Sequence, residues 1–308
     1  MRSSQLVRIG LLVVSSSSSL VVSQEEKESS LHHLRTATRR NQEEDGTVDL
    51  EQESNTVVGG TTASDGEFPF FALFGDTNCG GTMISDNRVL TAAHCVASGA
   101  PRSVRVGAST TSNGVEVGVS CSKTHPDWNS ETPFINDVAV LKLFGSTTVS
   151  PFATLNTNTA TPAGGADVLL VGFGQTTAGS STGTGSDTLQ KLTYSAISDT
   201  DCATAWGSRV SASSNICAQN TATTGACFGD SGGPLMATDK TTQLGLISGG
   251  SSNCASGGVP DVYTEVANFN GWITEQLTDS SCDACPYSQG CLEVVRRWMA
   301  QAAHRFSW

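Results

Sequence analysis

Between residues 57 and 277 the chain alternates short apolar runs with residues that form turns. Some runs alternate apolar and polar positions and others are continuously apolar, and Gly, Ser, Thr and Asn separate them. This pattern is typical of antiparallel β-strands joined by short connections, so we expect an all-β domain. The runs are FPFFALF, TMISDNRVLTAA, SVRVGAS, VEVGVS, DVAVLKL, DVLLVGFG, LQKLTYSAI, LGLISGG and DVYTEV.

Two further segments organise this region. The glycine-containing stretch TPAGGA at 161–166 is expected to link two halves, at about 57–160 and 161–265. The segment VANFNGWITEQL at 266–277 predicts a C-terminal helix, because its apolar residues recur at helical spacing. These residues are Val266, Phe269, Trp272, Ile273 and Leu277.

The first 56 residues differ in character from the rest. Arg2 and Arg8 precede an apolar stretch at 9–14, which resumes at 20–22 after a run of serines. This arrangement predicts a signal peptide over 1–23. Residues 24–56 are charged and nearly free of large apolar side chains, so we interpret them as a disordered pro-segment. No later segment has the run of about 18 apolar residues that a membrane span needs.

A tail at 278–308 follows the predicted helix. It contains three cysteines, and its last part again spaces apolar residues as a helix does. Packing on the domain is the favoured interpretation, and binding of a partner is the alternative. The apolar positions are Leu292, Val295, Trp298, Met299, Ala302 and Phe306.

Composition narrows the classes of function. The chain has 308 residues, with 17 Lys and Arg against 29 Asp and Glu, for a net charge of −12. Because so acidic a chain lacks the cations that bind phosphates, nucleic-acid binding is not expected. Ten cysteines, spread along a chain that is predicted to be exported, indicate disulfides. We therefore expect a secreted, extracellular protein.

Three residues form a candidate catalytic set. His94 lies in LTAAHC, Asp137 in INDVAVLKL and Ser231 in CFGDSGGPL. Serine nucleophiles need a base that takes the hydroxyl proton, an anion that orients the base, and donors that stabilise the oxyanion. Each residue taken singly has a structural explanation, such as a core histidine or a turn aspartate. All three together, in this order and with these flanks, point to catalysis.

These motifs resemble those of the chymotrypsin and trypsin family of serine proteases, over about 57–277. The resemblance implies two packed, six-stranded antiparallel β-barrels with the active site in the cleft between them. It implies that Ser231 is the nucleophile, His94 the general base and acid, and Asp137 the residue that orients His94. The backbone N–H groups of Gly229 and Ser231 would form the oxyanion hole.

The resemblance also implies activation by cleavage. VVGG at 57–60 matches the new N-terminus that processing creates in this family, and the Val57 amine would pair with buried Asp230. Relatives activated by trypsin-like cleavage have Lys or Arg just before this point, whereas this chain has Asn55-Thr56. The alternatives are a protease of other specificity, trimming after a first cut at Arg39-Arg40, and a zymogen that never matures.

Five residues would line the primary specificity pocket by the same resemblance. Gly225 would leave the base of the pocket uncharged, while Asp261 would place an acid on the opposite wall. We therefore predict Lys or Arg at the P1 position of the substrate, with tolerance for aromatic residues or Leu; a solvated loop aspartate is the alternative. Gly249 replaces a tryptophan that is usual in the family, which predicts weaker binding of P2 and P4 and a higher KM. The five residues are Gly225, Ser248, Gly249, Gly250 and Asp261.

Family pairing implies three disulfides, and four cysteines remain without an implied partner. We expect two further disulfides, one of them from the first half to the tail; a zinc site with His304 is the alternative. No cofactor and no metal site are expected otherwise. The implied pairs are Cys79–Cys95, Cys202–Cys217 and Cys227–Cys254, and the remaining cysteines are Cys121, Cys282, Cys285 and Cys291.

Two functions are compatible with these features. The first is a secreted serine endopeptidase made as a zymogen, and the second is a catalytically silent relative that binds or inhibits other proteins. Because no member of the set His94, Asp137 and Ser231 is lost, we favour the enzyme. We expect a monomer whose partners are protein or peptide substrates, an activating protease and protein inhibitors.

Overall fold

The structure is a computed structural model, and it describes residues 57–75, 78–179, 183–219, 221, 223–255 and 257–281. The predicted signal peptide, pro-segment and most of the tail lie outside the described residues. So do the cysteines at 282, 285 and 291.

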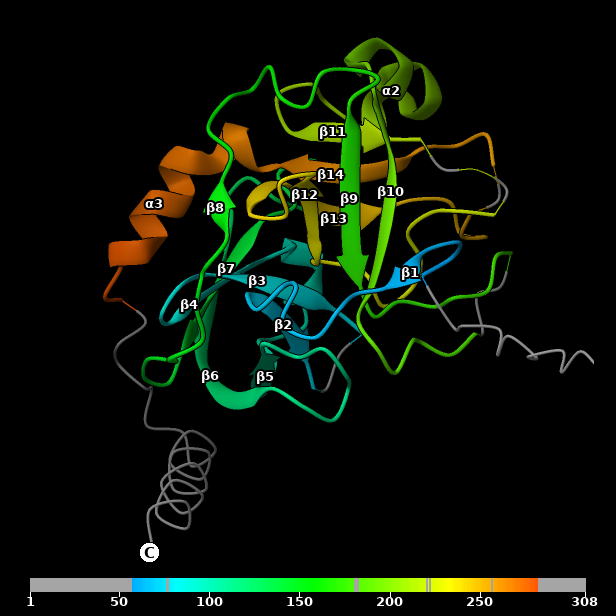
Figure 1. Cartoon of the computed structure of the whole chain (residues 1–308). Coiled ribbons are helices and arrows are strands. Elements are labelled where there is room, and N and C mark those ends of the chain that lie inside the picture. The colour runs from blue at the N-terminus through cyan, green and yellow to red at the C-terminus, as the bar shows by residue number, and fades with distance from the viewer. Residues whose placement is uncertain are drawn as a thin grey trace, which may run out of the picture. The chain divides into compact units, whose positions relative to one another are not determined.

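The first barrel is a closed antiparallel sheet of six strands in the order β2-β3-β4-β7-β6-β5 (Figure 1). Strand β6 is the longest of the six, and a register shift between Val119 and Cys121 bends it. The bounds are β2 Phe71–Phe74, β3 Gly80–Ser85, β4 Arg88–Thr91, β5 Ser103–Val106, β6 Val115–Thr124 and β7 Ala139–Leu143.

The second barrel closes in the order β9-β10-β11-β14-β13-β12, with β12 pairing back onto β9. The resemblance therefore predicted the fold correctly: two six-stranded antiparallel barrels. The bounds are β9 Asp167–Gly172, β10 Gln190–Ile197, β11 Asn215–Ala218, β12 Pro234–Ala237, β13 Thr242–Gly249 and β14 Asp261–Glu265.

Two short strands from the predicted first half pair with the second barrel. Strand β1 (Thr61–Thr62) pairs with β10, and β8 (Thr154–Leu155) runs parallel to β13. The chain before β2 and after β7 therefore extends onto the other barrel, while the six strands of each barrel lie on either side of residues 160 and 161.

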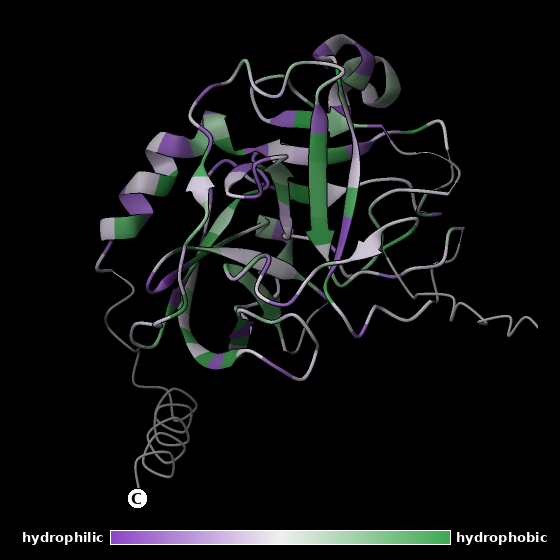
Figure 2. Ribbon diagram, viewed as in Figure 1, coloured by the Kyte–Doolittle hydropathy of each residue, from purple (hydrophilic) through white to green (hydrophobic). Residues whose placement is uncertain are grey.

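Strand β9 explains why some runs are apolar throughout. Val168 and Leu170 face the core of the second barrel, whereas Leu169 and Val171 pack with the core of the first. Because successive side chains of a strand point to opposite faces, a strand covered on both sides shows no alternation. Figure 2 shows β9 as a nearly continuous apolar arrow.

The predicted C-terminal helix is present as a 3-10 turn η3 (Val266–Phe269) followed by α3 (Asn270–Thr278). Its end lies against the first barrel, since Arg88 Nε donates to Gln276 O at 3.0 Å. Another 3-10 turn, η1 (Ala93–Cys95), follows β4. None of the helices in the described ranges is long and apolar enough to cross a membrane.

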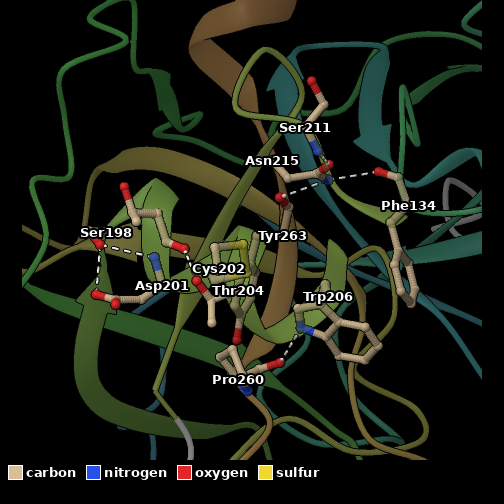
Figure 3. Close-up of a disulfide and its surroundings, with 12 residues drawn as sticks. Phe134, Ser198, Asp201, Cys202, Thr204, Trp206, Ser211, Asn215, Pro260 and Tyr263 are labelled. Atoms are coloured by element: carbon tan, nitrogen blue, oxygen red, sulfur yellow. Dashed lines mark hydrogen bonds between the residues drawn. A yellow bond between two sulfur atoms is a disulfide. The ribbon is translucent and has the colours of Figure 1, made fainter. Parts of the chain in front are cut away.

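Helix α2 (Asp199–Trp206), with the 3-10 turn η2 (Gly207–Arg209) after it, was not predicted. Ser198 caps its N-terminus by accepting from Asp201 N at 3.1 Å. The disulfide from Cys202 fixes the helix to β11, as Figure 3 shows. Only two of its residues are buried, so it lacks the apolar stripe by which sequence patterns reveal helices.

Candidate active site

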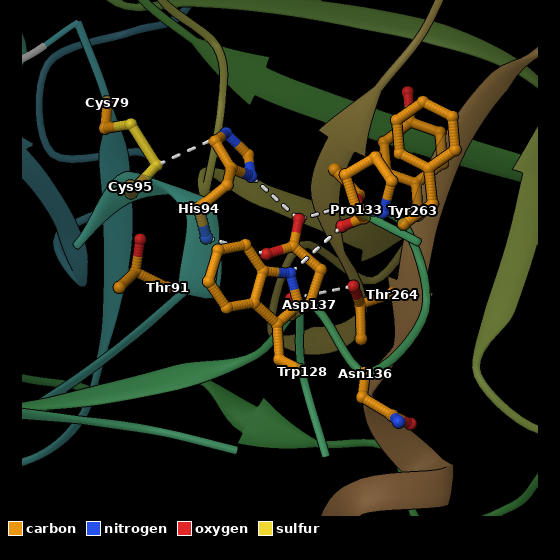
Figure 4. Close-up of polar contacts among 12 residues, drawn as sticks. Cys79, Thr91, His94, Cys95, Trp128, Pro133, Asn136, Asp137, Tyr263 and Thr264 are labelled. Atoms are coloured by element: carbon orange, nitrogen blue, oxygen red, sulfur yellow. Dashed lines mark hydrogen bonds and ion pairs between the residues drawn. A yellow bond between two sulfur atoms is a disulfide. The ribbon is translucent and has the colours of Figure 1, made fainter. Parts of the chain in front are cut away.

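His94 lies on η1, and Asp137 holds both its ring and its backbone. Asp137 Oδ2 is 2.7 Å from His94 Nδ1, and Asp137 Oδ1 accepts from the backbone N of His94 at 2.8 Å. The Asp137 side chain is fully buried just before β7, whereas that of His94 is 30% exposed. Figure 4 shows the imidazole between the carboxylate and the disulfide of Cys79 and Cys95.

The second barrel also binds Asp137. Ser248 Oγ, on β13, donates to Oδ2 at 2.6 Å, and Thr264 Oγ1, on β14, donates to the Asp137 carbonyl at 2.8 Å. A buried carboxylate is tolerated when its oxygens accept hydrogen bonds. Side chains from both barrels therefore fix the orientation of this carboxylate.

The His94 pKa is set by two opposing causes. Burial lowers the pKa of His94, but the hydrogen bond and the negative charge of Asp137 raise it more, so the net pKa is above the ordinary value of 6.5. With Nδ1–H donating to the carboxylate, Nε2 of the neutral ring is left as a proton acceptor. The arrangement can therefore take up a proton at Nε2.

Ser231 lies in a turn that packs against the base of the His94 turn. Gly80 N donates to Ser231 O at 2.8 Å. A Cβ on Gly232 would lie 3.0 Å from Cys95 Sγ, and that sulfur is 3.7 Å from His94 Nε2. The backbone beside Ser231 thus lies close to the imidazole. The described residues include no hydrogen bond between Ser231 Oγ and His94.

The turn before Ser231 presents two unused amides. Gly229 has φ +103°, a conformation that glycine adopts without strain. Within the described ranges, neither Gly229 N nor Ser231 N donates to another group of the protein. Two neighbouring N–H groups without internal acceptors can bind a negatively charged oxygen.

Asp230, between these two residues, points inward and is 1% exposed. Its oxygens accept from Gly174 N at 2.7 Å and from Cys227 N at 3.0 Å. Burial raises the pKa of Asp230 to about 7, and the nearby charge of Asp261 adds to this, against the lowering effect of the two hydrogen bonds. A Cβ on Gly172 or Gly174 would overlap the carboxylate, so glycine is required at both positions.

Val57 is fully buried in the second barrel among residues that include Val168 and Leu170. The next residue, Val58, accepts from Gly225 N at 3.3 Å. No ion pair joins Val57 and Asp230 among the described residues, and in this chain the Val57 nitrogen is the amide that follows Thr56. The first residues of the domain thus contact the loop that forms the predicted pocket base.

Asp261 is 1% exposed at the start of β14. Its Oδ2 accepts from Ala226 N at 2.7 Å, and its Oδ1 would lie 2.7 Å from a Cβ on Gly250. The structure therefore brings together Asp261, Gly250 and the segment after Gly225. Ser248 and Gly249 are the last two residues of β13, and the Ser248 hydroxyl donates to Asp137.

Gly249 is covered by an aromatic ring that the sequence analysis missed. A Cβ on Gly249 would come within 2.5 Å of Phe134 Cε1. The Phe134 ring, three residues before Asp137, packs edge-on against Trp206 with ring centroids 5.2 Å apart. The site of the expected tryptophan is therefore filled from the first barrel, and nothing in the local sequence around Phe134 signalled this.

Comparisons with known proteins agree with this architecture. The family model described as trypsin matches residues 57–273. The chain belongs to the trypsin family. It is 33% identical to trypsin delta of Drosophila melanogaster over 234 residues, which are 73% of this chain and 89% of that protein. It is 35% identical to trypsin-1 of Astacus astacus over 240 residues, 70% of this chain and 98% of that protein.

A solved structure of a relative gives the same result. Neuropsin, a serine protease expressed in the limbic system of mouse brain, superposes with a TM-score of 0.64 at 26% identity. The match covers 71% of this chain and 98% of neuropsin. Family membership classes the chain as a trypsin-like serine endopeptidase.

The trypsin-family domain contains the three implied disulfides: Cys79–Cys95, Cys202–Cys217 and Cys227–Cys254. Cys121 is also disulfide-bonded. Since those six cysteines pair with one another, the partner of Cys121 lies outside the described residues.

One group of metal-ligand side chains occurs among the described residues, at Cys79, His94 and Cys95, with ligand atoms within 4.8 Å. Both sulfurs of this group form a disulfide with each other. Thiolate is the form of cysteine that binds metals, so this group has only the imidazole as a ligand.

A groove of about 770 Å³ lies beside the turn of Gly229 in the trypsin-family domain. Phe74 and Cys79 line it from the first barrel, while Phe173 and Phe228 line it from the second. Phe228 is 45% exposed, so an apolar ring stands at the rim. Residues of both barrels therefore line the groove, and Gly229 is one of them.

Proposed function

We propose that this chain is made as a secreted zymogen and becomes a serine endopeptidase that cleaves peptide bonds through an acyl-enzyme. The observation that carries the proposal is the His94–Asp137 pair beside the turn of Ser231, where two backbone amides donate to no acceptor in the described part of the chain. Family membership supports the same reaction class.

In the proposed reaction, Ser231 Oγ attacks the carbonyl carbon of the scissile bond. His94 Nε2 takes the hydroxyl proton and then gives it to the leaving amine, while Asp137 stabilises the imidazolium. The N–H groups of Gly229 and Ser231 donate to the oxyanion of the tetrahedral intermediate. Water then attacks the acyl-enzyme, with His94 again taking the proton.

Activation is proposed to occur at Val57. Cleavage after Thr56 would create an α-ammonium, and pairing with Asp230 would give the buried carboxylate the cation that it lacks. The raised pKa of Asp230, about 7, supports the need for such a partner. Since Asn55-Thr56 is no site for a trypsin-like activator, the cut requires a protease of other specificity or trimming after Arg39-Arg40.

Substrate preference is proposed to be for Lys or Arg at P1, with tolerance for large apolar side chains. The buried carboxylate of Asp261 beside Gly250 supports a pocket with one acid on its wall. Replacing Asp261 by Gly should lower the rate of hydrolysis of substrates with Lys or Arg at P1 more than that of substrates with Leu at P1. An unchanged P1 profile would remove Asp261 from the pocket.

The experiment that tests the proposal uses processed protein and a fluorophosphonate probe. The probe should label Ser231 in the processed chain, and Ser231→Ala should abolish labelling. N-terminal sequencing of secreted material should give a start at Val57. If correctly processed protein stays unlabelled, the silent binding relative becomes the better interpretation.

A further inference from the structure

Arg209 is an exposed cation with no carboxylate partner among the residues that the structure describes. Its guanidinium carbon lies 5.2 Å from the ring centre of Phe134 and 4.9 Å from that of Trp206. Cation–π contacts of this kind hold a guanidinium in place and leave its N–H edges available to a ligand. In a chain of net charge −12, this position offers a localised positive charge.

The two rings under Arg209 form a fixed support. Phe134 is 8% exposed and Trp206 is 9% exposed. Trp206 Nε1 donates to Pro260 O at 3.0 Å, and Phe134 O accepts from Asn215 Nδ2 at 2.7 Å, as Figure 3 shows. The Trp206 ring and the Phe134 backbone are therefore anchored to the second barrel, and the two rings pack against each other, so Arg209 rests on a fixed support.

This support lies next to strand β13, which also carries Ser248 of the candidate active site. The Phe134 ring touches Gly249 at the end of β13. Along β13, Leu246 pairs with Pro234, the first residue of β12, and Ile247 N donates to Gly233 O at 3.0 Å. Beyond Ile247 the β12 side of the strand therefore has no partner in the described part of the chain, and an extended peptide can add there as a strand.

An added strand places its side chains in a fixed order. Side chains two residues apart in a strand lie on the same face, about 7 Å apart. If the scissile bond lies at Ser231, the P2 and P4 side chains of such a strand would share one face, and the P4 side chain would fall nearer to Phe134, which contacts Gly249. Arg209, whose guanidinium carbon lies 5.2 Å from the centre of that ring, would then be within reach of a long P4 side chain.

We propose that Arg209 selects substrates with an acidic side chain at P4, through a charge-assisted pair with the guanidinium. This inference rests on the proposed function, and it replaces the expectation that Gly249 leaves this region without a binding platform. Because the pair is solvent-exposed, the preference for Glu over Gln at P4 should be about fivefold in kcat/KM.

The test compares peptides that share residues P3 to P1 and differ only in Glu or Gln at P4. Wild-type enzyme should show the fivefold ratio at low salt, and the ratio should fall as salt is added. Arg209→Gln should bring the ratio to about one, because kcat/KM for the Glu peptide falls to that for the Gln peptide. Arg209→Lys should give an intermediate ratio, and Arg102→Gln, a control on the first barrel, should leave the ratio unchanged.

The outcomes separate this inference from the proposed function. If both peptides are hydrolysed and the ratio persists in Arg209→Gln, or is already one in wild type, the role of Arg209 is refuted and the endopeptidase stands. If processed protein hydrolyses neither peptide and the fluorophosphonate does not label Ser231, both proposals are refuted.

Discussion

One carboxylate, that of Asp137, holds both the ring and the backbone of His94, at 2.7 Å to Nδ1 and 2.8 Å to N. The ring therefore cannot rotate without losing a bond to a fully buried anion. This double contact fixes the orientation of the imidazole, and with Nδ1–H donating to the carboxylate it leaves Nε2 as the nitrogen that can accept a proton.

Replacing Asp137 by Asn should lower kcat by a factor on the order of 10⁴, the loss known for this change in a triad of the chymotrypsin type. The amide group cannot accept from Nδ1–H and from N at once, so the ring would favour the wrong tautomer. Steady-state kinetics on a peptide substrate and a thermal melt check this. The matched control is Asp127→Asn in an exposed loop; a comparable loss there would contradict the assignment.

The pH profile of the processed enzyme should reflect the raised pKa of His94. Burial lowers this pKa, but Asp137 raises it above 6.5. Because only the neutral ring accepts a proton, activity should fall on the acid side through a midpoint above 6.5. A profile of kcat/KM against pH measures this midpoint, and a value clearly below 6.5 would show that the pair is not formed in solution.

Adding one methyl group at Gly249 should destabilise the domain. The new Cβ would lie 2.5 Å from Phe134 Cε1, and that ring is confined by Trp206. Gly249→Ala should therefore lower the free energy of unfolding by roughly 1–3 kcal/mol in urea denaturation. Combined with Phe134→Leu, the loss should be smaller than the sum of the two single effects. Strict additivity would mean that the ring and Gly249 are not in contact.

The ion pairs of Glu67 should contribute stability at neutral pH and lose it in acid. Burial raises the Glu67 pKa, but hydrogen bonds from Lys191, Lys240 and Ser64 N lower it to about 2 from the ordinary 4.5. The stabilisation is therefore complete above pH 4.5 and declines as pH falls toward 2. Glu67→Gln should lower Tm at pH 7 and do so less at pH 3.

The control for this prediction is Glu116→Gln. Glu116 is 51% exposed and pairs with Arg105 at 3.4 Å, so its removal should change Tm little. If Glu67→Gln lowers Tm by the same amount at pH 7 and pH 3, the ion pairs are not the cause of the loss.

Glu265 should make the stability of the domain depend on pH in the opposite direction to Glu67. Glu265 is 3% exposed, its Oε1 has no hydrogen-bond partner among the described residues, and burial together with Asp199 raises its pKa to about 7. A folded-state pKa above the ordinary 4.5 means that stability is complete below pH 4.5 and is lost as pH rises through 7. Glu265→Gln should therefore raise Tm relative to wild type at pH 8 and not at pH 4.5. Glu275→Gln, on the exposed side of α3, should show no such dependence.

Sequence patterns were most informative where one physical effect dominates. Hydrophobic burial produced the apolar runs, and these runs became strands such as β9 and β10. Helix α3 followed from the spacing of its apolar residues. Barrel closure did not follow from the runs, because pairing between distant strands leaves no local signal; the resemblance to a family supplied it.

The missed features share a different cause. Helix α2 depends on a cap and a disulfide rather than on an apolar stripe. Phe134 packs against Gly249, 115 positions farther along the chain, and only the folded structure brings them together. The hydroxyl of Ser248 binds Asp137, a contact that its predicted place in the pocket wall did not include. Long-range contacts between side chains are what the sequence alone does not reveal.

The bond from Thr264 to Asp137 also bears on biosynthesis, since the two residues are 127 positions apart. While the ribosome is still making the second barrel, Asp137 lacks the hydrogen bonds from Ser248 and Thr264. A translation product that ends before β14 would thus carry the reactive groups without their alignment. The supports of Asp137 therefore come from strands that are translated after Ser231, so a chain that stops before β13 would lack both of them.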